Sequence, residues 1–182
     1  LDKFQRNLII IFSLLFYAFW NISFVLLILY FCAATYIFIK KNNYFKTSIF
    51  LIILPLAYFK YSIFLLDILN LNQFDSFAYN GEIPLAISFI TFTAIAAIID
   101  TKNRIFDKNL INFYSISEFI LFFPQLIAGP ILRLNELMPQ LKNKCIFKKE
   151  NVKFGLILFS VGFVKKIFFA DNIGIFIDPI FE

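Results

Sequence analysis

Four long apolar runs constrain the fold of this chain more than any other feature of its sequence. They occupy residues 7–39, 47–70, 84–99 and 154–170. A helix crosses the hydrocarbon core of a bilayer with about 20 apolar residues, whereas a membrane strand alternates apolar and polar side chains. These runs do not alternate, and only 16% of the 182 residues are charged while 60% are hydrophobic. The mean hydropathy is +0.80. The sequence therefore predicts an all-α, polytopic transmembrane protein.

The first run is longer than one membrane crossing requires. It is interrupted at "FWNIS", which places Trp20, Asn21 and Ser23 inside an apolar stretch. Basic residues flank it on both sides, with Arg6 before it and Lys40 after it. The pattern favours a hairpin of two short helices with both ends in the cytoplasm and Trp20 at the far interface.

The charges of the following loops alternate in the way that consecutive membrane crossings require. The loop after residue 70 carries Asp75 and Glu82 and no basic residue, so we expect it to face outward. The run 84–99 then crosses back, with Pro84 in the first turn of its helix. The basic stretch "DTKNRIFDKN" at 100–109 returns the chain to the cytoplasm.

The last run, 154–170, is predicted to cross outward. It leaves acidic residues and no basic residue after it, namely Asp171, Asp178 and Glu182. Lys165 and Lys166 conflict with this orientation, because they lie near the outer end of the expected helix.

The segment 115–132 does not fit a simple crossing. It is flanked by basic residues on both sides, its apolar stretch is short, and Pro124, Gly129 and Pro130 would each bend or end a helix. A re-entrant element with both ends on the cytoplasmic side satisfies these observations together. Irregular backbone at membrane depth must be covered by protein or by a water-filled cavity. We therefore expect this segment to form a wall of a functional cavity.

Polar side chains in this segment are candidate ligand-binding groups. Gln125 needs hydrogen-bond partners in a dry setting, Gly129 allows close backbone approach, and Arg133 offers a planar fork of donors for a phosphate, a carboxylate or several carbonyls. The alternative is a packing kink with Arg133 simply at the interface. Lys60 lies among apolar residues, as a functional ionisable group or as a snorkelling lysine at a helix break.

Lys166, Asp171 and Asn172 form another polar group. The spacing of five between Lys166 and Asp171 exceeds the three or four that places side chains on one helix face, so a helix that ends near Ala170 also explains them. Cys32 and Cys145 have no metal-ligand or redox spacing, and no metal site is expected. The chain has 0 histidines, which excludes catalysis by histidine within these residues.

Five segments carry a resemblance to a known family, and they occur in the family's order. They are "SLLFYAFWN" at 13–21, "YFKY" at 58–61, "PLAISFITFTAIAAIID" at 84–100, "FFPQLIAGPILR" at 122–133 with "MPQL" at 138–141, and "GFVKKIFFADNIGIFIDPIF" at 162–181. With these segments the chain resembles, over nearly its whole length, a bacterial membrane-bound O-acyltransferase (MBOAT) of the alginate O-acetylation type.

The resemblance implies a multi-pass enzyme of the bacterial inner (cytoplasmic) membrane. Such an enzyme moves an acyl group, usually acetyl, from a cytoplasmic thioester (acetyl-CoA or an acyl carrier) toward an extracytoplasmic polysaccharide such as peptidoglycan or an exopolysaccharide. The thioester is a co-substrate, and no bound cofactor is implied. The family's catalytic histidine lies in its later half. Residues 1–182 are therefore expected to be one membrane domain that lacks the first span and the catalytic half, and to be inactive alone.

The resemblance also assigns expected roles and partners. It places Pro124, Gln125, Gly129, Pro130 and Arg133 in the wall of the acyl-donor cavity, and it assigns no catalytic residue within this chain. Four further residues are carried over with less support: Lys60, Lys166, Asp171 and Asn172. The implied partners are membrane lipids, the glycan acceptor and an extracytoplasmic acetyltransferase protein, and no nucleic acid.

Two alternative functions remain open from the sequence. D-alanyl transfer to teichoic acid is a second acyl-transfer reaction, carried out by a related branch of the family. A transporter or channel subunit is the non-enzymatic alternative, because broken helices and Lys60 would also suit a permeation path.

Overall fold

The computed structural model describes residues 3–41, 44–70, 79, 81–126, 129–142 and 147–181, and every element within these ranges is a helix. The chain forms two compact units, the first ending at Lys144 and the second beginning at Cys145. Most of the loop that was expected to face outward, residues 71–78, lies outside the described residues, as do Cys145 and Glu182. The prediction of an all-helical fold is confirmed.

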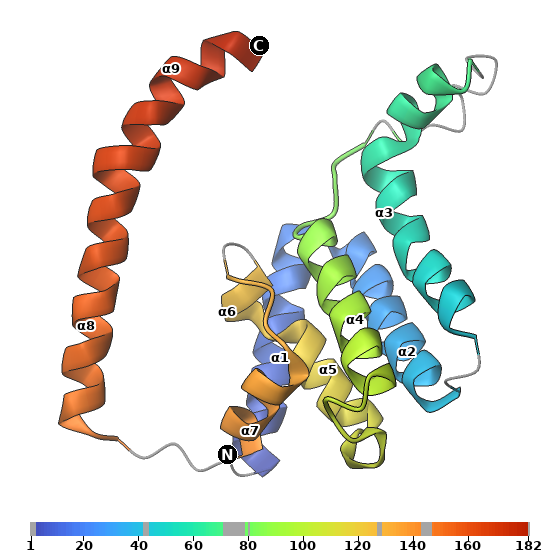
Figure 1. Cartoon of the computed structure of the whole chain (residues 1–182), viewed down its shortest axis with the longest axis horizontal. Helices are drawn as coiled ribbons and strands as arrows, with labels where there is room; N and C mark the ends of the chain where they lie inside the picture. Colours follow the sequence, from blue (N-terminus) through green and yellow to red (C-terminus); the bar gives the residue numbers. More distant parts are fainter. Residues whose placement is uncertain are drawn as a thin grey trace. The chain divides into compact units, whose positions relative to one another are not determined.

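The first unit begins with a helical hairpin, as predicted from "FWNIS". Helix α1 (Lys3–Trp20) ends just before Asn21, and α2 (Val25–Lys41) runs back beside it (Figure 1). A short 3₁₀ turn, Ile22–Phe24, joins them, and the Asn21 side chain accepts a hydrogen bond of 2.9 Å from the backbone N–H of Ser23. Asparagine therefore ends one helix and caps the next turn.

Helix α2 is the centre of this unit. It packs against α4 (Ile87–Lys102) and α5 (Phe113–Leu121), and Ile28, Phe31 and Cys32 on it are completely buried. Cys32 is thus a core thiol, as expected. Helix α3 (Phe45–Ile68) packs on α2 and α4, and the Tyr30 hydroxyl of α2 donates to the carbonyl of Leu51 at 2.9 Å.

Two helices within the described ranges are long and apolar enough to cross a membrane, judged by length and composition. They are Ile22–Lys41, which joins the 3₁₀ turn to α2, and Phe45–Ile68. Most of α3 is exposed in the isolated chain although it is strongly apolar. Such a surface is costly in water and suits a lipid environment.

Helix α4 begins later than predicted. Its first residue is Ile87, and Pro84 precedes the helix instead of occupying its first turn. The reason is Ala86, whose φ of 55° is left-handed and separates Pro84 from the helical backbone. The helix then continues to Lys102, beyond the expected end at Ile99.

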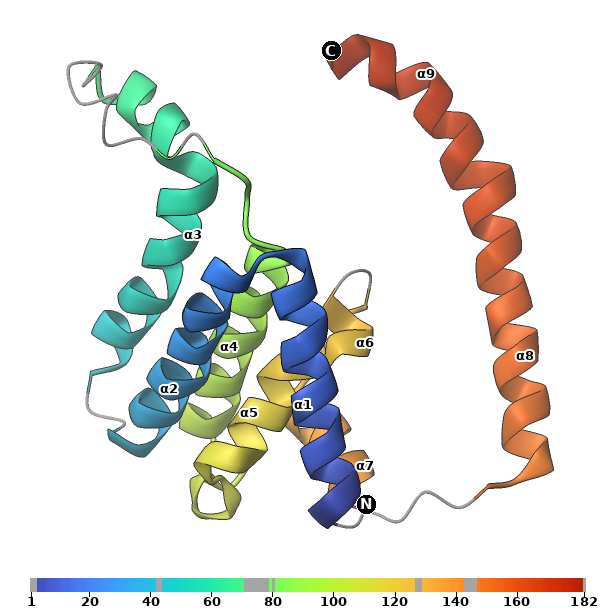
Figure 2. The ribbon, with the colours of Figure 1, turned by 180° about the vertical axis from the view of Figure 1, so that it is seen from behind.

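The helix termini of the first unit gather at two opposite ends. The start of α1, the ends of α2 and α4, and the start of α5 lie together (Figures 1 and 2), and we call this the basic end. These helix ends and the connection after α4 carry Arg6, Lys40, Lys41, Lys102, Arg104 and Lys108. Lys46 is at the start of α3, where the Phe45 ring contacts Lys102. At the opposite end, the turn between α1 and α2 meets the start of α4, where the Tyr17 hydroxyl donates to the carbonyl of Leu85 at 3.1 Å.

The second unit is one continuous helical segment. Helix α8 (Lys149–Val164) leads into a π-helical stretch, Lys165–Asp171, and then into α9 (Asn172–Phe181). The expected end of a helix near Ala170 is therefore wrong. All residues from 147 to 177 are exposed except Gly174, which is half-buried.

Candidate functional site

The segment from α5 to α7 is broken at the positions that its prolines and glycine predicted. Helix α5 ends at Leu121, Phe122 leaves helical geometry with a ψ of 90°, and α6 is only Phe123–Leu126. Pro124 is in the first turn of α6, where backbone N–H groups have no acceptor within the helix, so the N–H that proline lacks is not needed. Helix α7 (Leu134–Lys142) then runs back toward the basic end (Figures 1 and 2). We call residues 113–142 the broken segment.

Gly129 lies where the broken segment turns back closely on itself. Its N–H donates to the carbonyl of Gln125 at 3.1 Å. A Cβ at this position would lie 2.5 Å from Cα and 2.7 Å from Cβ of Gln125. Only glycine therefore fits without displacing backbone, as the sequence predicted from close approach. The neighbouring Pro130 is exposed, as is Pro124.

Gln125 is buried, with 6% of its surface exposed. Its side-chain carbonyl oxygen Oε1 has no hydrogen-bond partner within the described part of the chain. A buried amide oxygen without a partner costs about 1–3 kcal/mol. Gln125 thus offers an acceptor to a donor from outside these residues.

Arg133 directly precedes helix α7 and ties it to α4. Its backbone carbonyl accepts from the N–H groups of Glu136 and Leu137, both at 3.1 Å, and its own N–H donates to Oε2 of Glu136 at 3.2 Å. This arrangement is one half of a capping box. The guanidinium atom Nη1 lies 3.2 Å from Oδ1 of Asp100, near the end of α4.

The Asp100–Arg133 pair is only partly satisfied. The side chain of Asp100 is 2% exposed and that of Arg133 is 56% exposed, so the carboxylate is buried while most of the guanidinium fork faces outward. The second oxygen of Asp100, Oδ2, has no partner among the described residues. The sequence analysis did not single out Asp100, although an acidic residue at the end of an apolar span is a signal for such a site.

A second buried carboxylate, Glu118 on α5, was also missed. It is completely buried and forms a two-pronged ion pair with Arg6 of α1, in which Nε donates to Oε1 at 2.7 Å and Nη2 contacts Oε2. The ring of Tyr114 lies below the guanidinium, 4.9 Å from its carbon, and the Tyr114 hydroxyl donates to Asn7 at 2.5 Å. The sequence shows Arg6 only as a flanking charge, because its partner is more than a hundred positions away.

Lys166, Asp171 and Asn172 of the second unit do lie together, but a π-helix brings them together instead of the end of a helix. Lys166 Nζ lies 2.8 Å from Oδ2 of Asp171, although a spacing of five places two residues on different faces of an α-helix. A π-helix bonds residues five apart and so places this pair on one face. The amide of Asn172 donates to the carbonyls of Ile167 and Phe168, at 3.3 and 2.9 Å. The three residues form a cluster within the second unit.

Lys60 lies in the interior of α3 rather than at a helix break. It is exposed, and its Nζ is 5.5 Å from the centre of the Tyr61 ring. No carboxylate oxygen of the described residues lies within 4.0 Å of the Lys60 Nζ atom. Lys60 also takes part in none of the polar contacts of the broken segment described above.

The sequence is similar to bacterial O-acetyltransferases. It is 38% identical over 121 residues to a peptidoglycan O-acetyltransferase from Helicobacter pylori. This alignment covers 53% of this chain and 23% of that protein. It is 38% and 37% identical over 101 residues to probable alginate O-acetylases from Pseudomonas aeruginosa and Pseudomonas putida, each match covering 54% of this chain and 19% or 20% of the relative. No family model and no solved structure matches.

Over about half of the chain, these relatives confirm the resemblance to MBOAT proteins of the alginate O-acetylation type that the sequence segments indicated. The aligned region spans about a fifth of the length of the relatives. The activity, substrates and partners of the whole protein are therefore matters for proposal.

Proposed function

We propose that the full-length protein is a membrane O-acyltransferase. It transfers an acyl group, with acetyl as the favoured one, from a cytoplasmic thioester to an extracytoplasmic cell-envelope polysaccharide such as peptidoglycan or an exopolysaccharide. The observation that carries this proposal is the 37–38% identity to proteins named as peptidoglycan and alginate O-acetylating enzymes. This similarity favours acyl transfer over the transporter alternative.

The proposed setting is the cytoplasmic membrane, which the helices cross several times. The basic end faces the cytoplasm, because cationic residues favour that side. Both termini of the broken segment lie toward this end, which supports a re-entrant element rather than a full crossing (Figures 1 and 2). The apolar exposed surfaces of α3 and of the second unit then contact lipid or other parts of the whole protein.

Within this setting, the broken segment forms a wall of the acyl-donor cavity. The buried oxygens Gln125 Oε1 and Asp100 Oδ2 lack partners among the described residues and can accept hydrogen bonds. The amide N–H groups of the arm that carries an acyl thioester are suitable donors. Among the described residues only Nη1 of the Arg133 guanidinium contacts a side chain, that of Asp100, so its other N–H groups can donate to an anionic or carbonyl group.

The reaction requires groups that these residues do not supply. A general base must take the proton of the attacking hydroxyl as it attacks the thioester carbonyl. We assign no catalytic residue within this chain, which contains 0 histidines. The hydroxyl oxygen bonds to the acyl carbon while the carbon–sulfur bond of the thioester breaks, and the thiol leaves with the proton that the base took up. The hydroxyl belongs to the glycan acceptor itself or to an intermediate carrier from which an extracytoplasmic acetyltransferase partner completes the transfer.

The substitution Arg133→Ala in the full-length protein tests the cavity-wall role. We expect glycan O-acetylation to fall about tenfold, as for the loss of one charge-assisted hydrogen bond, with membrane insertion unchanged. The readout is acetate released by base from purified glycan, normalised to protein level. Lys148→Ala is the matched control, because it removes an exposed cation nearby in the sequence.

A double variant separates binding from stability. Arg133→Ala leaves the buried Asp100 carboxylate unpaired, whereas Arg133→Ala with Asp100→Asn removes both charges. Acetylation that stays low in the double variant supports the cavity role. Normal acetylation in either variant would contradict it.

A further inference from the structure

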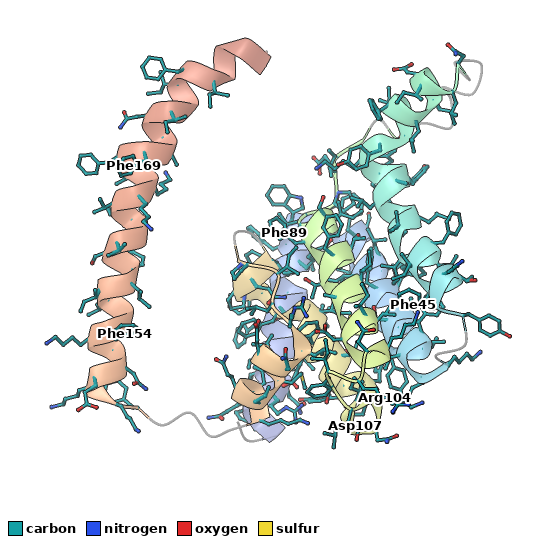
Figure 3. All side chains as sticks on the ribbon, viewed as in Figure 1. Phe45, Phe89, Arg104, Asp107, Phe154 and Phe169 are labelled. Carbon is teal, nitrogen blue, oxygen red and sulfur yellow. The ribbon has the colours of Figure 1, made fainter. Side chains whose placement is uncertain are left out.

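A basic pocket lies beyond the C-terminal end of α4, and its lining includes none of the residues proposed above for the wall of the acyl-donor cavity. Its volume is about 420 Å³. Its lining residues come from the last turn of α4 and the connection that follows it: Thr101, Lys102, Arg104, Phe106, Asp107 and Lys108. Figure 3 shows Arg104 and Asp107 at this end of the helix. Three cations against one carboxylate give the pocket a formal charge of +2 (3 − 1).

Arg104 occupies a backbone position that normally favours glycine. Its φ is 58°, in the left-handed region. The N–H of Arg104 donates to the carbonyl of Thr101 at 3.2 Å, and the N–H of Ile105 donates to that of Asp100 at 2.9 Å. These two bonds form a Schellman motif, in which glycine is the usual left-handed residue. The backbone of a non-glycine residue is strained in this conformation. The presence of arginine instead of glycine therefore points to a role for its side chain.

The walls of the pocket are held by neighbouring helices. Lys102 Nζ lies 3.4 Å from the centre of the Phe45 ring at the start of α3. Lys40, at the end of α2, donates through Nζ to the carbonyl of Lys108 at 3.0 Å. Asp107 caps the short 3₁₀ turn Lys108–Leu110 by accepting from the N–H of Asn109 at 2.9 Å. The cations are thus carried on a braced connection rather than on a free loop.

We infer that this pocket binds a phosphate group. An arginine fork and two lysines match the geometry and the charge of a phosphate monoester or diester. The group comes from the headgroup of an anionic lipid or from a soluble phosphate-bearing molecule, since both present the same oxygens. This binding site does not depend on acyl transfer, and its test measures binding alone.

The key variant is Arg104→Gly in the full-length protein. It removes the guanidinium and also relieves the left-handed strain, so the thermal midpoint should hold or rise while phosphate binding weakens about tenfold. Asp107→Asn should tighten binding, because asparagine keeps the cap and loses the repelling charge. Lys41→Gln is the matched control; it removes a cation from the basic end outside the pocket and should weaken binding less than about twofold.

Two arms distinguish the sources of the phosphate. In phosphatidylcholine nanodiscs, ³¹P line broadening of added inorganic phosphate or glycerol 1-phosphate reports soluble ligands. In detergent, native mass spectrometry reports retained phosphatidylglycerol. Loss of either signal in Arg104→Gly, with its retention in Lys41→Gln, supports the site and identifies the source. Equal signals in Arg104→Gly and Lys41→Gln, no binding in either arm, or binding that Asp107→Asn fails to strengthen would each overturn the proposal.

Discussion

At the residue scale, position 129 requires glycine because the backbone of Gln125 lies so close to it, and not because the turn needs a left-handed residue. No left-handed glycine occurs among the described residues, so the need for glycine here arises from space. The atoms that a side chain would meet belong mainly to the backbone of Gln125, which cannot rotate away. The same backbone positions the unpartnered oxygen of Gln125.

We predict that Gly129→Ala destabilises the protein by about 1–3 kcal/mol, the usual cost of forcing extra atoms into a packed site. The measurement is the thermal midpoint of the full-length protein in detergent. Gly155→Ala is the matched control, because nothing lies within 4 Å of a Cβ there and alanine favours a helix. Equal thermal midpoints for the two variants would contradict the prediction, because they would show that the backbone around Gly129 can move to accommodate a methyl group at little cost.

Residues with local signals were foreseen, and those with distant partners were not. Gln125, Gly129 and Arg133 stand next to helix breakers in an apolar run, which is visible in a short window of sequence. Asp100 and Glu118 were missed because their importance depends on Arg133 and Arg6, which lie 33 and 112 positions away. Burial and pairing of these carboxylates are properties of the packing alone.

At the element scale, one buried ion pair joins α1 to α5. Glu118 is completely buried, while the side chain of Arg6 is 20% exposed. Removing either partner would leave a charge in a low-dielectric position, whereas removing both would not. The start of the broken segment is therefore fixed to the first helix by electrostatics as well as by packing.

We predict that Arg6→Met lowers the free energy of unfolding by about 3 kcal/mol, because it leaves the Glu118 carboxylate buried without a partner. The double variant Arg6→Met with Glu118→Leu should recover most of this loss. Both are measured as thermal midpoints of the full-length protein in one detergent. A double variant as unstable as the single one would mean that the pair does not act through its buried charge.

The second unit shows how an unusual element alters a sequence interpretation. Spacing rules for an α-helix separate Lys166 from Asp171, whereas the π-helical stretch pairs them. The pairing also bears on the conflict that Lys166 raised for an outward crossing. Asp171 places a negative charge beside Lys166, but the two side chains remain 48% and 68% exposed, so the pair is weak and the conflict with an outward crossing remains.

At the scale of the whole molecule, the gathering of basic helix ends is the main organising feature. The helices of the first unit alternate in direction, and α5 and α7 of the broken segment run in opposite directions (Figures 1 and 2). Charge parity along the sequence and helix direction in the structure therefore agree. This agreement supports the proposed orientation.

Single-cysteine labelling in intact cells tests that orientation, with Cys145→Ser as the background. We predict that Asn109→Cys, just before the broken segment, and Gln140→Cys, in its last turn, react only after the cytoplasmic face is made accessible. Glu82→Cys, at the opposite end, should react from outside. All three positions are exposed. Labelling of residues 109 and 140 from opposite sides would show a full crossing and contradict the re-entrant element.

The sequence by itself determined the helical class, the hairpin at Asn21, the breaks around Pro124 and Gly129, and the resemblance to O-acetylating enzymes. These features follow from hydrophobic runs, helix breakers and local motifs, which act over a few residues. Only the tertiary structure decided that Asp100 meets Arg133, that Glu118 meets Arg6, and that cations of α4 and the connection after it surround a pocket. Such pairings depend on which helices pack together, and a one-dimensional pattern does not encode that choice.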